Sequence, residues 1–390
     1  MINYELYIPT RIVYGQGKHK EVGRYLKPHT SKVLLVYGGG SVKRTGLYDA
    51  VVESLKQEGI EWMELGGVKS NPTLEKVNEG IRICRENDIR FLLAVGGGSV
   101  IDTAKTIAFG FDYEGDVWDF YAKKVQITHA LPIGTILTIP GTASEVSKNT
   151  VLTNEHTQEK IGILHECLRP VFSILDPTLC LTIPKNQIAN GVYDAFCHTL
   201  ERYMDPIMHT DVIDGIAEGV MKGLLKNGSA VYKNQSDVDA WGEIMIGSNF
   251  AHNSMTGFGR KGDWANHPME EVVSGIYDIP HGAGLSIITP AWMRYIYKKH
   301  LPIFVQFAVN VMGVSGPLRD QERIALEGIE KLEEFSRKMG LPLHLSELNI
   351  DDSQLEFMAK RCASYQKDGR LGQLEKLSWE DILEIYRLAL

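Results

Sequence analysis

The stretch Arg90–Lys105, RFLLAVGGGSVIDTAK, joins an apolar run to a helical pattern through three consecutive glycines. The apolar run predicts a buried strand, and the residues from Ser99 onward predict a helix. Because glycine has no Cβ, the backbone of such a turn can approach an anion closely, and the free N–H groups of the helix start point towards it. The alternative is an ordinary tight turn of a parallel sheet, because the pattern is not the GxGxxG dinucleotide fingerprint.

Similar units lie on both sides of this stretch, each bounded by glycine or proline. We expect strands at 32–37, 60–65, 90–95, 133–138, 150–153, 160–164 and 171–175, and helices at 46–58, 73–87 and 99–109. After Pro184, longer amphipathic segments predict helices at 187–204, 211–226, 238–254, 283–298, 319–339, 351–364 and 379–389. The chain therefore predicts an α/β dinucleotide-binding domain with a parallel sheet at 1–183, followed by an all-helical domain at 184–390.

Composition and charge exclude several classes of protein. The 390 residues include 41 Lys and Arg against 49 Asp and Glu, a net charge of -8, which argues against a nucleic-acid-binding protein. The five cysteines are scattered without a CxxC pair and indicate neither a disulfide framework nor a thiolate zinc site. We find no signal-peptide pattern and no apolar run long enough to span a membrane, so we expect a cytoplasmic protein without a membrane partner.

A second glycine turn, Gly38–Ser41, follows the strand expected at 32–37 and precedes Lys43 and Arg44. In a nucleotide site, an acidic residue at such a strand end would hold the ribose 2′-hydroxyl and repel a 2′-phosphate. Its absence beside two cations favours NADP(H) over NAD(H). The alternative is a surface turn with solvated Lys and Arg side chains.

Four residues of the second half could bind a metal ion. Asp194 and His198 are four residues apart, so a helix places both on one face. His267 and His281 follow in a region marked by glycine and proline, with His281 in an expected loop. Three imidazoles and one carboxylate suit one divalent ion, Fe²⁺ or Zn²⁺, with a position left for substrate. Taken singly, each of these residues is also typical of a helix surface or of a hydrogen-bonded core histidine.

Several ordered motifs resemble one family over nearly the whole chain. They are GGGSVID (96–102), TIPGTASE (138–145), LDPTLCLTIP (175–184), DAFCHTLE (194–201) and PHG (280–282). Together they resemble the iron-containing alcohol dehydrogenase family, most closely its branch of butanol dehydrogenases and broad-range NADP-dependent aldehyde reductases. The resemblance implies a dehydroquinate synthase-like architecture, a divalent metal in the cleft between the domains and a homodimer. It also implies reversible hydride transfer between NADP(H) and a primary alcohol or aldehyde such as butanol or butanal.

The resemblance also assigns individual residues. Its four metal-ligand positions are matched by Asp194, His198, His267 and His281. The pyrophosphate turn is matched by Gly97, Gly98 and Ser99, and the aspartate beside the nicotinamide by Asp102. The other positions that match cofactor contacts are Gly38, Ser41, Asn71, Thr138, Ser147, Asn149, Lys160 and Thr182. Members that prefer NAD often carry aspartate at the position of Gly38, which agrees with NADP(H).

Two features depart from the family pattern. Many relatives carry a further histidine four residues after the third metal ligand, where this chain has Glu271, so a proton relay cannot be carried over. The segment 256–266, TGFGRKGDWAN, is also unlike the shorter version in many members. We expect Phe258 and Trp264 to form a wall of the substrate pocket; the alternative is simple packing. No catalytic residue beyond the metal ligands is assigned.

Three alternative functions remain open. A sugar-phosphate cyclase of the dehydroquinate synthase type shares the architecture, but it needs Lys and Arg for a phosphorylated substrate, and only Arg202 lies near the expected metal helix. A polyol dehydrogenase that prefers NAD is the second alternative. The third is a metal- or nucleotide-binding protein without activity, against which the intact set of four ligands argues.

Overall fold

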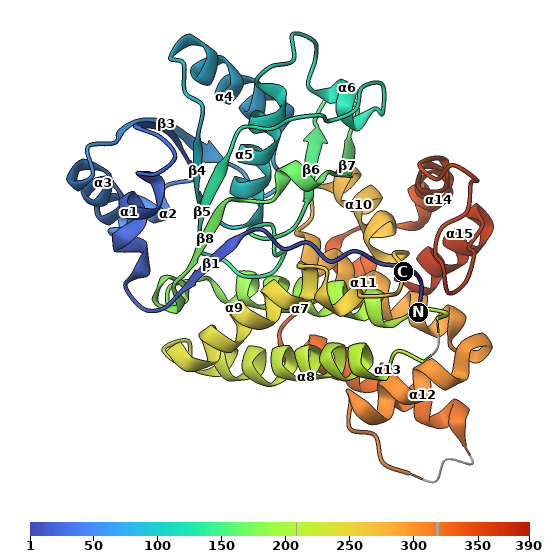
Figure 1. Cartoon of the computed structure of the whole chain (residues 1–390). Coiled ribbons are helices and arrows are strands. Elements are labelled where there is room, and N and C mark those ends of the chain that lie inside the picture. The colour runs from blue at the N-terminus through green and yellow to red at the C-terminus, as the bar shows by residue number, and fades with distance from the viewer. Residues whose placement is uncertain (208, 317–319) are drawn as a thin grey trace. The chain divides into compact units, whose positions relative to one another are not determined.

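A computed structural model describes residues 1–207, 209–316 and 320–390, which form two compact units (Figure 1). The sheet unit comprises Tyr7–Ile183 and Ser236–Met245. The helical unit comprises Met1–Leu6, Pro184–Gln235 and Ile246–Leu390. Compared with the expected domains 1–183 and 184–390, only the two short segments 1–6 and 236–245 belong to the other unit.

The sheet unit contains a six-stranded parallel sheet in the order β1-β8-β5-β4-β2-β3 and a separate antiparallel hairpin of β6 and β7. The strands are β1 (Arg11–Tyr14), β2 (Lys32–Gly38), β3 (Glu61–Val68), β4 (Leu92–Gly96), β5 (Ile133–Leu137), β6 (Asn149–Asn154), β7 (Glu159–Leu164) and β8 (Phe172–Leu175). Every predicted strand is confirmed. The sequence did not indicate β1, because only Val13 of its four residues is buried and the strand lies at the edge of the sheet.

Helices cover both faces of this sheet (Figure 1). They are α1 (Val22–Leu26), α2 (Ser41–Arg44), α3 (Leu47–Gln57), α4 (Leu74–Glu86), α5 (Gly98–Gly110) and α6 (Trp118–Tyr121). On one face, Val33 and Leu35 of β2 belong to the same buried cluster as Leu55 of α3. The α/β class with a parallel sheet is confirmed. Both faces need a helical cover, because successive side chains of a strand point to opposite faces of the sheet.

The helical unit is built from α7 (Lys185–Tyr203), α8 (Asp211–Lys233), the end of α9 (Val238–His252), α10 (Asn266–Tyr277), α11 (His281–Ile296), α12 (Leu301–Asn310), α13 (Gln321–Lys338), α14 (Leu355–Ser364) and α15 (Trp379–Leu388). Its helical class is confirmed, but α10 and α12 were not predicted. Each has a proline in its first turn, Pro268 and Pro302, where no intrahelical N–H donor is needed, so these prolines do not interrupt the helices. Residue 319, where one helix was expected to begin, lies outside the described residues.

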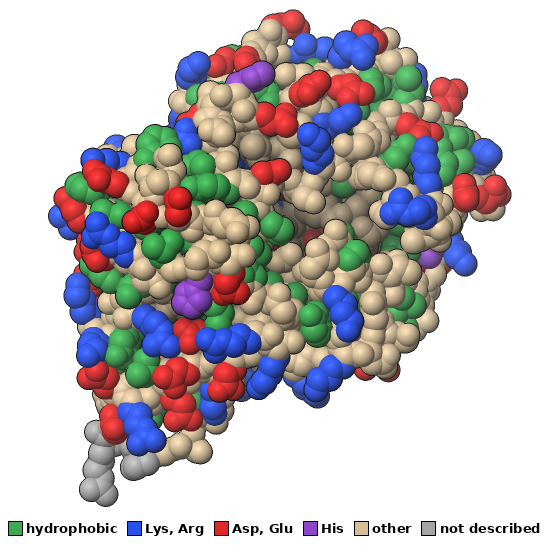
Figure 2. All heavy atoms as spheres, turned by 180° about the vertical axis from the view of Figure 1, so that it is seen from behind, with side chains coloured by type: hydrophobic (Ala, Val, Ile, Leu, Met, Phe, Trp, Pro, Cys, Tyr) green, Lys and Arg blue, Asp and Glu red, His purple; other side chains and the backbone are tan. Residues whose placement is uncertain are grey.

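On the face drawn in Figure 2, Lys and Arg side chains are interspersed with Asp and Glu. Neither sign of charge is concentrated in one region of this face. None of the described helices combines the length and the apolar character that crossing a membrane requires.

Two glycine substitutions should separate packing from backbone effects. A Cβ at Gly134 of β5 would collide with the ring of the buried Phe172, so Gly134→Ala should lower the free energy of unfolding by about 1–3 kcal/mol. A Cβ at Gly219, in the exposed middle of α8, meets no atom within 4 Å, so Gly219→Ala should raise it by up to about 1 kcal/mol. Denaturant unfolding of both variants measures the two effects, and equal changes would contradict the packing at Gly134.

Candidate metal centre

Helix α7 begins directly after Pro184 and carries the first two predicted ligands. Asp194 and His198 lie one turn apart on it, and both are more than nine-tenths buried. The Nδ1 atom of His198 is 3.2 Å from Oδ1 of Asp194. The helix therefore holds a carboxylate and an imidazole on one buried face.

Helices α10 and α11 supply the other two histidines. His267 is the second residue of α10, and His281 is the first residue of α11. We expected His281 in a loop just before a helix that starts at residue 283. This is wrong, because the helix already begins at His281. Because α11 packs against both α10 and α7, the two histidines meet the face of α7 that carries Asp194.

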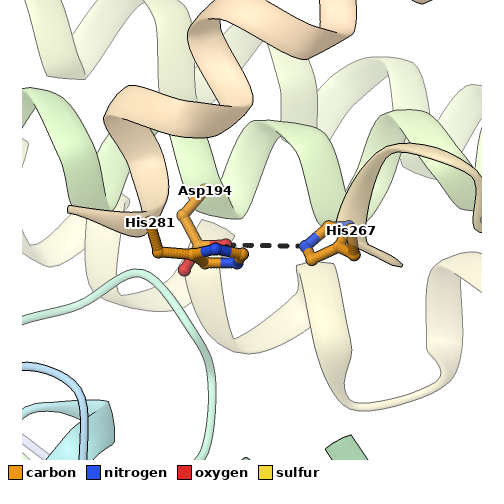
Figure 3. Close-up of side chains that lie close together, drawn as sticks. All are labelled: Asp194, His267 and His281. Carbon is orange, nitrogen blue, oxygen red and sulfur yellow. Dashed lines mark ion pairs between the residues drawn. The ribbon is translucent and has the colours of Figure 1, made fainter. Parts of the chain in front are cut away.

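Figure 3 shows Asp194, His267 and His281 pointing towards one another. The Nε2 atoms of both histidines are 3.7 Å from Oδ1 of Asp194, and one donor atom from each of the three residues lies within 4.8 Å of the others. His198 is outside this group of three but adjoins it, since its ring centroid is 4.4 Å from that of His267. The structure thus brings the four predicted ligands together.

Three polar atoms of this cluster are buried without a hydrogen-bond partner. They are Oδ1 of Asp194, Nδ1 of His198 and Nε2 of His267. A buried polar atom that forms no hydrogen bond costs about 1–3 kcal/mol, so three together indicate that the protein surrounds a group that interacts with all of them. A carboxylate oxygen and imidazole nitrogens are the donors that Fe²⁺ and Zn²⁺ accept, so the cluster fits such an ion.

Two further carboxylates, Glu201 and Glu270, were not singled out in the sequence. Both are completely buried; Glu201 contacts Nδ1 of His267, and Glu270 contacts Nδ1 of His281. The second oxygen of Glu201 accepts the backbone N–H of Asn266 at 2.6 Å. By holding a proton on Nδ1, each carboxylate makes Nε2, which faces Asp194, the nitrogen that is available to a metal ion. Helical spacing could have found them, since Glu201 is three residues after His198 and Glu270 three after His267.

The charges in and around the cluster do not cancel. The three carboxylates of Asp194, Glu201 and Glu270 are accompanied by one buried guanidinium, that of Arg202, which donates to the carbonyl of His198. Burial lowers the pKa of Arg202 to about 10, so it stays charged at neutral pH. Burial also lowers the pKa of His267, but Glu201 and Asp194 outweigh this and raise it to about 10. Protonated His267 leaves one negative charge in excess, and a divalent cation that replaces its Nε2 proton would balance the two negative charges that then remain.

The two aromatic residues expected in a pocket wall occupy different places. Trp264 lies beside the cluster, with its ring centroid 5.8 Å from that of His267, and it also lines a cavity of about 490 Å³. Phe258 is 36% exposed and packs edge-on against Tyr4, with ring centroids 5.1 Å apart. Trp264 therefore borders both the histidines and a cavity, whereas the observed contact of Phe258 is packing.

In the sheet unit, the predicted phosphate turn lies between β4 and α5. Strand order reverses between β2 and β4, because the chain continues to β3 on one side and to β5 and β8 on the other. Dinucleotides bind outside the carboxyl ends of strands at such a point. Gly38 ends β2 beside it, and Gly97 and Gly98 follow β4. The hydroxyl of Ser99 donates to the carbonyl of Ser70, which holds the neighbouring Asn71 near the turn.

Buried polar contacts fix the loop that follows β5 against α5. Asp102 accepts the hydroxyl of Ser144 at 2.5 Å and the N–H of Val151 at 3.2 Å, and burial raises its pKa. Lys105 is fully buried and donates to the carbonyls of Ser147 at 2.9 Å and Asn149 at 2.7 Å. Asp102, Ser147 and Asn149 are therefore brought together along one side of α5.

The remaining predicted cofactor residues differ in where they lie relative to the two glycine turns. Thr138 donates its N–H to the carbonyl of Gly96, so it lies beside the turn, and Lys160 is close enough to lower the pKa of Asp102. Ser41 begins α2 directly after its glycine turn. Thr182 is exposed, and among the described residues we find no contact that links it to the turn.

Comparisons with known proteins agree with this arrangement. Residues 9–177 match the model of the iron-containing alcohol dehydrogenase family, and residues 188–390 match the model of its C-terminal part. The chain is 42% identical over 388 residues to NADH-dependent butanol dehydrogenase A of Clostridium acetobutylicum, covering 99% of each chain. It is 33% identical over 393 residues to the NADPH-dependent aldehyde reductase YqhD of Escherichia coli, covering 100% of both. The crystal structure of NADH-dependent butanol dehydrogenase A from Thermotoga maritima superposes with a TM-score of 0.96 at 39% identity, covering 100% of this chain and 99% of the other.

Asp263, next to Trp264, should make stability depend on pH. Burial raises the pKa of Asp263 to about 7, although the N–H groups of Leu374 and Gln373 donate to it. In the unfolded chain the group ionises near pH 4, so the native state loses stability as the pH rises from about 4 to 7. Asp263→Asn keeps an acceptor oxygen. Its free energy of unfolding should equal that of the wild type at pH 4 and be higher by up to roughly 4 kcal/mol at pH 8. Urea unfolding between these pH values measures the difference, and a difference that is independent of pH would contradict the raised pKa.

Proposed function

Because the chain belongs to the iron-containing alcohol dehydrogenase family, we propose that it transfers a hydride reversibly between NADP(H) and a primary alcohol or aldehyde such as butanol or butanal. That it is an alcohol dehydrogenase or aldehyde reductase dependent on a nicotinamide cofactor follows from the family. The observation that carries the proposal is the cluster of Asp194, His198, His267 and His281. In it, Oδ1 of Asp194, Nδ1 of His198 and Nε2 of His267 are buried without a hydrogen-bond partner.

One divalent ion, Fe²⁺ or Zn²⁺, would be held by Asp194, His198, His267 and His281. When bound, it supplies a Lewis acid that polarises an alcohol or carbonyl oxygen. Glu201 and Glu270 keep the Nδ1 protons of His267 and His281 in place, so that the Nε2 lone pairs stay directed at one point. The two metals accept these ligands comparably, so availability decides between them.

The proposed cofactor site lies in the sheet unit at the reversal of strand order. The glycine turn and the start of α5 present backbone N–H groups to the pyrophosphate, and no Cβ obstructs its approach. Lys105 holds the loop of Ser147 and Asn149 in place by two hydrogen bonds from its buried ammonium group. The residues that we assign to cofactor binding are Gly38, Ser41, Asn71, Gly97, Gly98, Ser99, Asp102, Thr138, Ser147, Asn149, Lys160 and Thr182.

The preference for NADP(H) rests on Gly38, since no carboxylate ends β2 where it would repel a 2′-phosphate. Lys43 is less available to a 2′-phosphate than we expected, because its Nζ is 3.1 Å from Glu64 and lies over the rings of Tyr37 and Tyr48. Arg44 is exposed and remains as a cation for the phosphate. Relatives are named both NADH-dependent and NADPH-dependent, so a direct comparison of the two cofactors is required.

We also propose that the enzyme is a cytoplasmic homodimer without nucleic-acid or membrane partners. The edge strand β1 supports the homodimer, because its free edge and the partly exposed Ile12 and Tyr14 could pack against a second copy. The cyclase alternative gains no support from the full-length relatives, which are named as dehydrogenases and reductases. The polyol alternative has one point in its favour: a relative of lower identity, from Citrobacter freundii, is named 1,3-propanediol dehydrogenase.

Initial rates on butanal with NADPH and with NADH, at matched concentrations and with metal content assayed, test the proposal. We expect rapid oxidation of NADPH and a kcat/KM for NADPH at least about tenfold above that for NADH, because a 2′-phosphate gains charge-assisted hydrogen bonds. Equal rates would refute the NADP(H) preference and leave the reductase intact. No oxidation of either cofactor by protein with bound metal would refute the reductase itself.

Metal affinity should depend on the histidines and on the carboxylates behind them. His281→Ala should lose both metal and turnover, and Glu270→Gln should weaken metal binding about 10–100-fold, because Nε2 becomes less basic. Glu218→Gln is the matched control, since Glu218 is a buried carboxylate of the same unit that accepts the hydroxyl of Tyr203 instead. Chelator competition on protein reloaded with Zn²⁺ measures these affinities.

Two results would contradict the assignment. Wild-type metal affinity in His281→Ala would remove that histidine from the ligand set. Equal losses of affinity in Glu270→Gln and Glu218→Gln would show that any buried carboxylate has the same effect through stability alone.

A further inference from the structure

The cavity beside Trp264 has an unusual set of charged side chains. Its lining includes Lys367, Arg370 and Lys376 against one exposed carboxylate, that of Asp368. Among the described residues, none of these three cations forms an ion pair. On the same loop, by contrast, Glu375 pairs with both Lys299 and His300. In a chain with a net charge of -8, this cavity therefore carries a local excess of positive charge.

The loop that presents these cations is held in place. The N–H groups of Gln373 and Leu374 donate to Oδ2 of the buried Asp263 at 3.0 and 2.7 Å. Leu371 and Leu377 pair with each other through two backbone hydrogen bonds of 2.9 and 2.8 Å. The loop backbone is therefore fixed before any ligand arrives, which lowers the entropy cost of binding.

Trp264 borders both this cavity and the histidine cluster. Its ring lines the cavity, while its centroid lies 5.8 Å from those of His267 and His252. Its backbone has a φ of 58°, which is rare for a bulky residue and is characteristic of functional sites. The guanidinium of Arg202 lies 4.4 Å from the ring centroid, and the indole N–H donates to the carbonyl of Lys261 at 3.0 Å. The ring is thus fixed as a common wall.

We propose that this cavity binds the anionic end of the substrate, so that the enzyme acts on aldehydes that carry a carboxylate at the far end of the carbon chain. This inference rests on the proposed function, because the aldehyde end must reach the metal cluster. The aldehyde takes up a hydride from the reduced cofactor and a proton from solvent to become the alcohol, and the carboxylate is unchanged. Lys367, Arg370 and Lys376 attract that carboxylate, and the indole of Trp264 contacts the methylene chain.

Matched pairs of aldehydes test this assignment. We compare 4-oxobutanoate with butanal, and 6-oxohexanoate with hexanal, because each pair has one chain length and differs in charge. For at least one length, the wild-type kcat/KM of the acid should exceed that of the neutral aldehyde. The ratio should fall about tenfold in Lys367→Ala/Arg370→Ala, the effect of two ion pairs near the surface, and should also fall at high salt.

The control variant is Lys222→Ala/Lys226→Ala, which removes two exposed cations from α8 in the same unit and leaves the same net charge. Its acid-to-neutral ratio should equal that of the wild type. Lys376→Gln is a second variant that removes the third cation of the cavity lining, and its acid-to-neutral ratio should fall as well. Thermal unfolding of each protein identifies a variant that fails to fold, and the remaining variant then provides the test.

The outcomes separate this inference from the proposed function. If neither butanal nor hexanal is reduced with either cofactor, the proposed function fails. If the neutral aldehydes are reduced but the ratio is the same in the wild type and both cavity variants, the anion site is overturned and the reductase stands. A ratio that falls equally in the α8 control would also overturn it, because net charge alone would then explain the preference.

Discussion

Glu201 and Glu270 are carboxylates without solvent exposure, and each contacts a histidine Nδ1 and one further donor. This pairing is what makes two charged groups tolerable inside the helical unit. It also determines which ring nitrogen of His267 and His281 stays free, and thereby directs both rings at Asp194. The packing of α7, α10 and α11 follows from the same contacts, because moving any of these helices would leave a buried charge unpaired. The centre is therefore negative without a metal, and a divalent ion held there would stabilise it.

In the sheet unit, buried charged groups position the proposed cofactor site. The dinucleotide that we propose needs a bare backbone at its phosphates and rigid surroundings, and both are present where the strand order reverses between β2 and β4. Gly97 and Gly98 leave the helix start accessible, while the buried ammonium of Lys105 ties the loop after β5 to α5. In both units, fully buried ionic groups position the side chains and backbone that meet the ligands.

Much of this fold could be predicted from the sequence, because buried strands appear as apolar runs and helices as amphipathic periods. Strand β1 could not, since three of its four residues are exposed, and α10 was hidden by Pro268 in its first turn. The four metal-ligand candidates were found through helical spacing and family motifs. Glu201 and Glu270 were missed because a glutamate on a helix is usually a surface residue, and the pairing of Lys43 with Glu64 depends on the contact between β2 and β3.

Anomalous diffraction from crystals grown with Zn²⁺, recorded on both sides of the zinc absorption edge, tests the central claim most directly. The account predicts one strong peak at about 2.0–2.2 Å from an oxygen of Asp194, a ring nitrogen of His198, and Nε2 of His267 and His281. It also predicts that Glu201 and Glu270 keep their contacts with Nδ1. A peak elsewhere, with the three donors still facing one another unfilled, would contradict it.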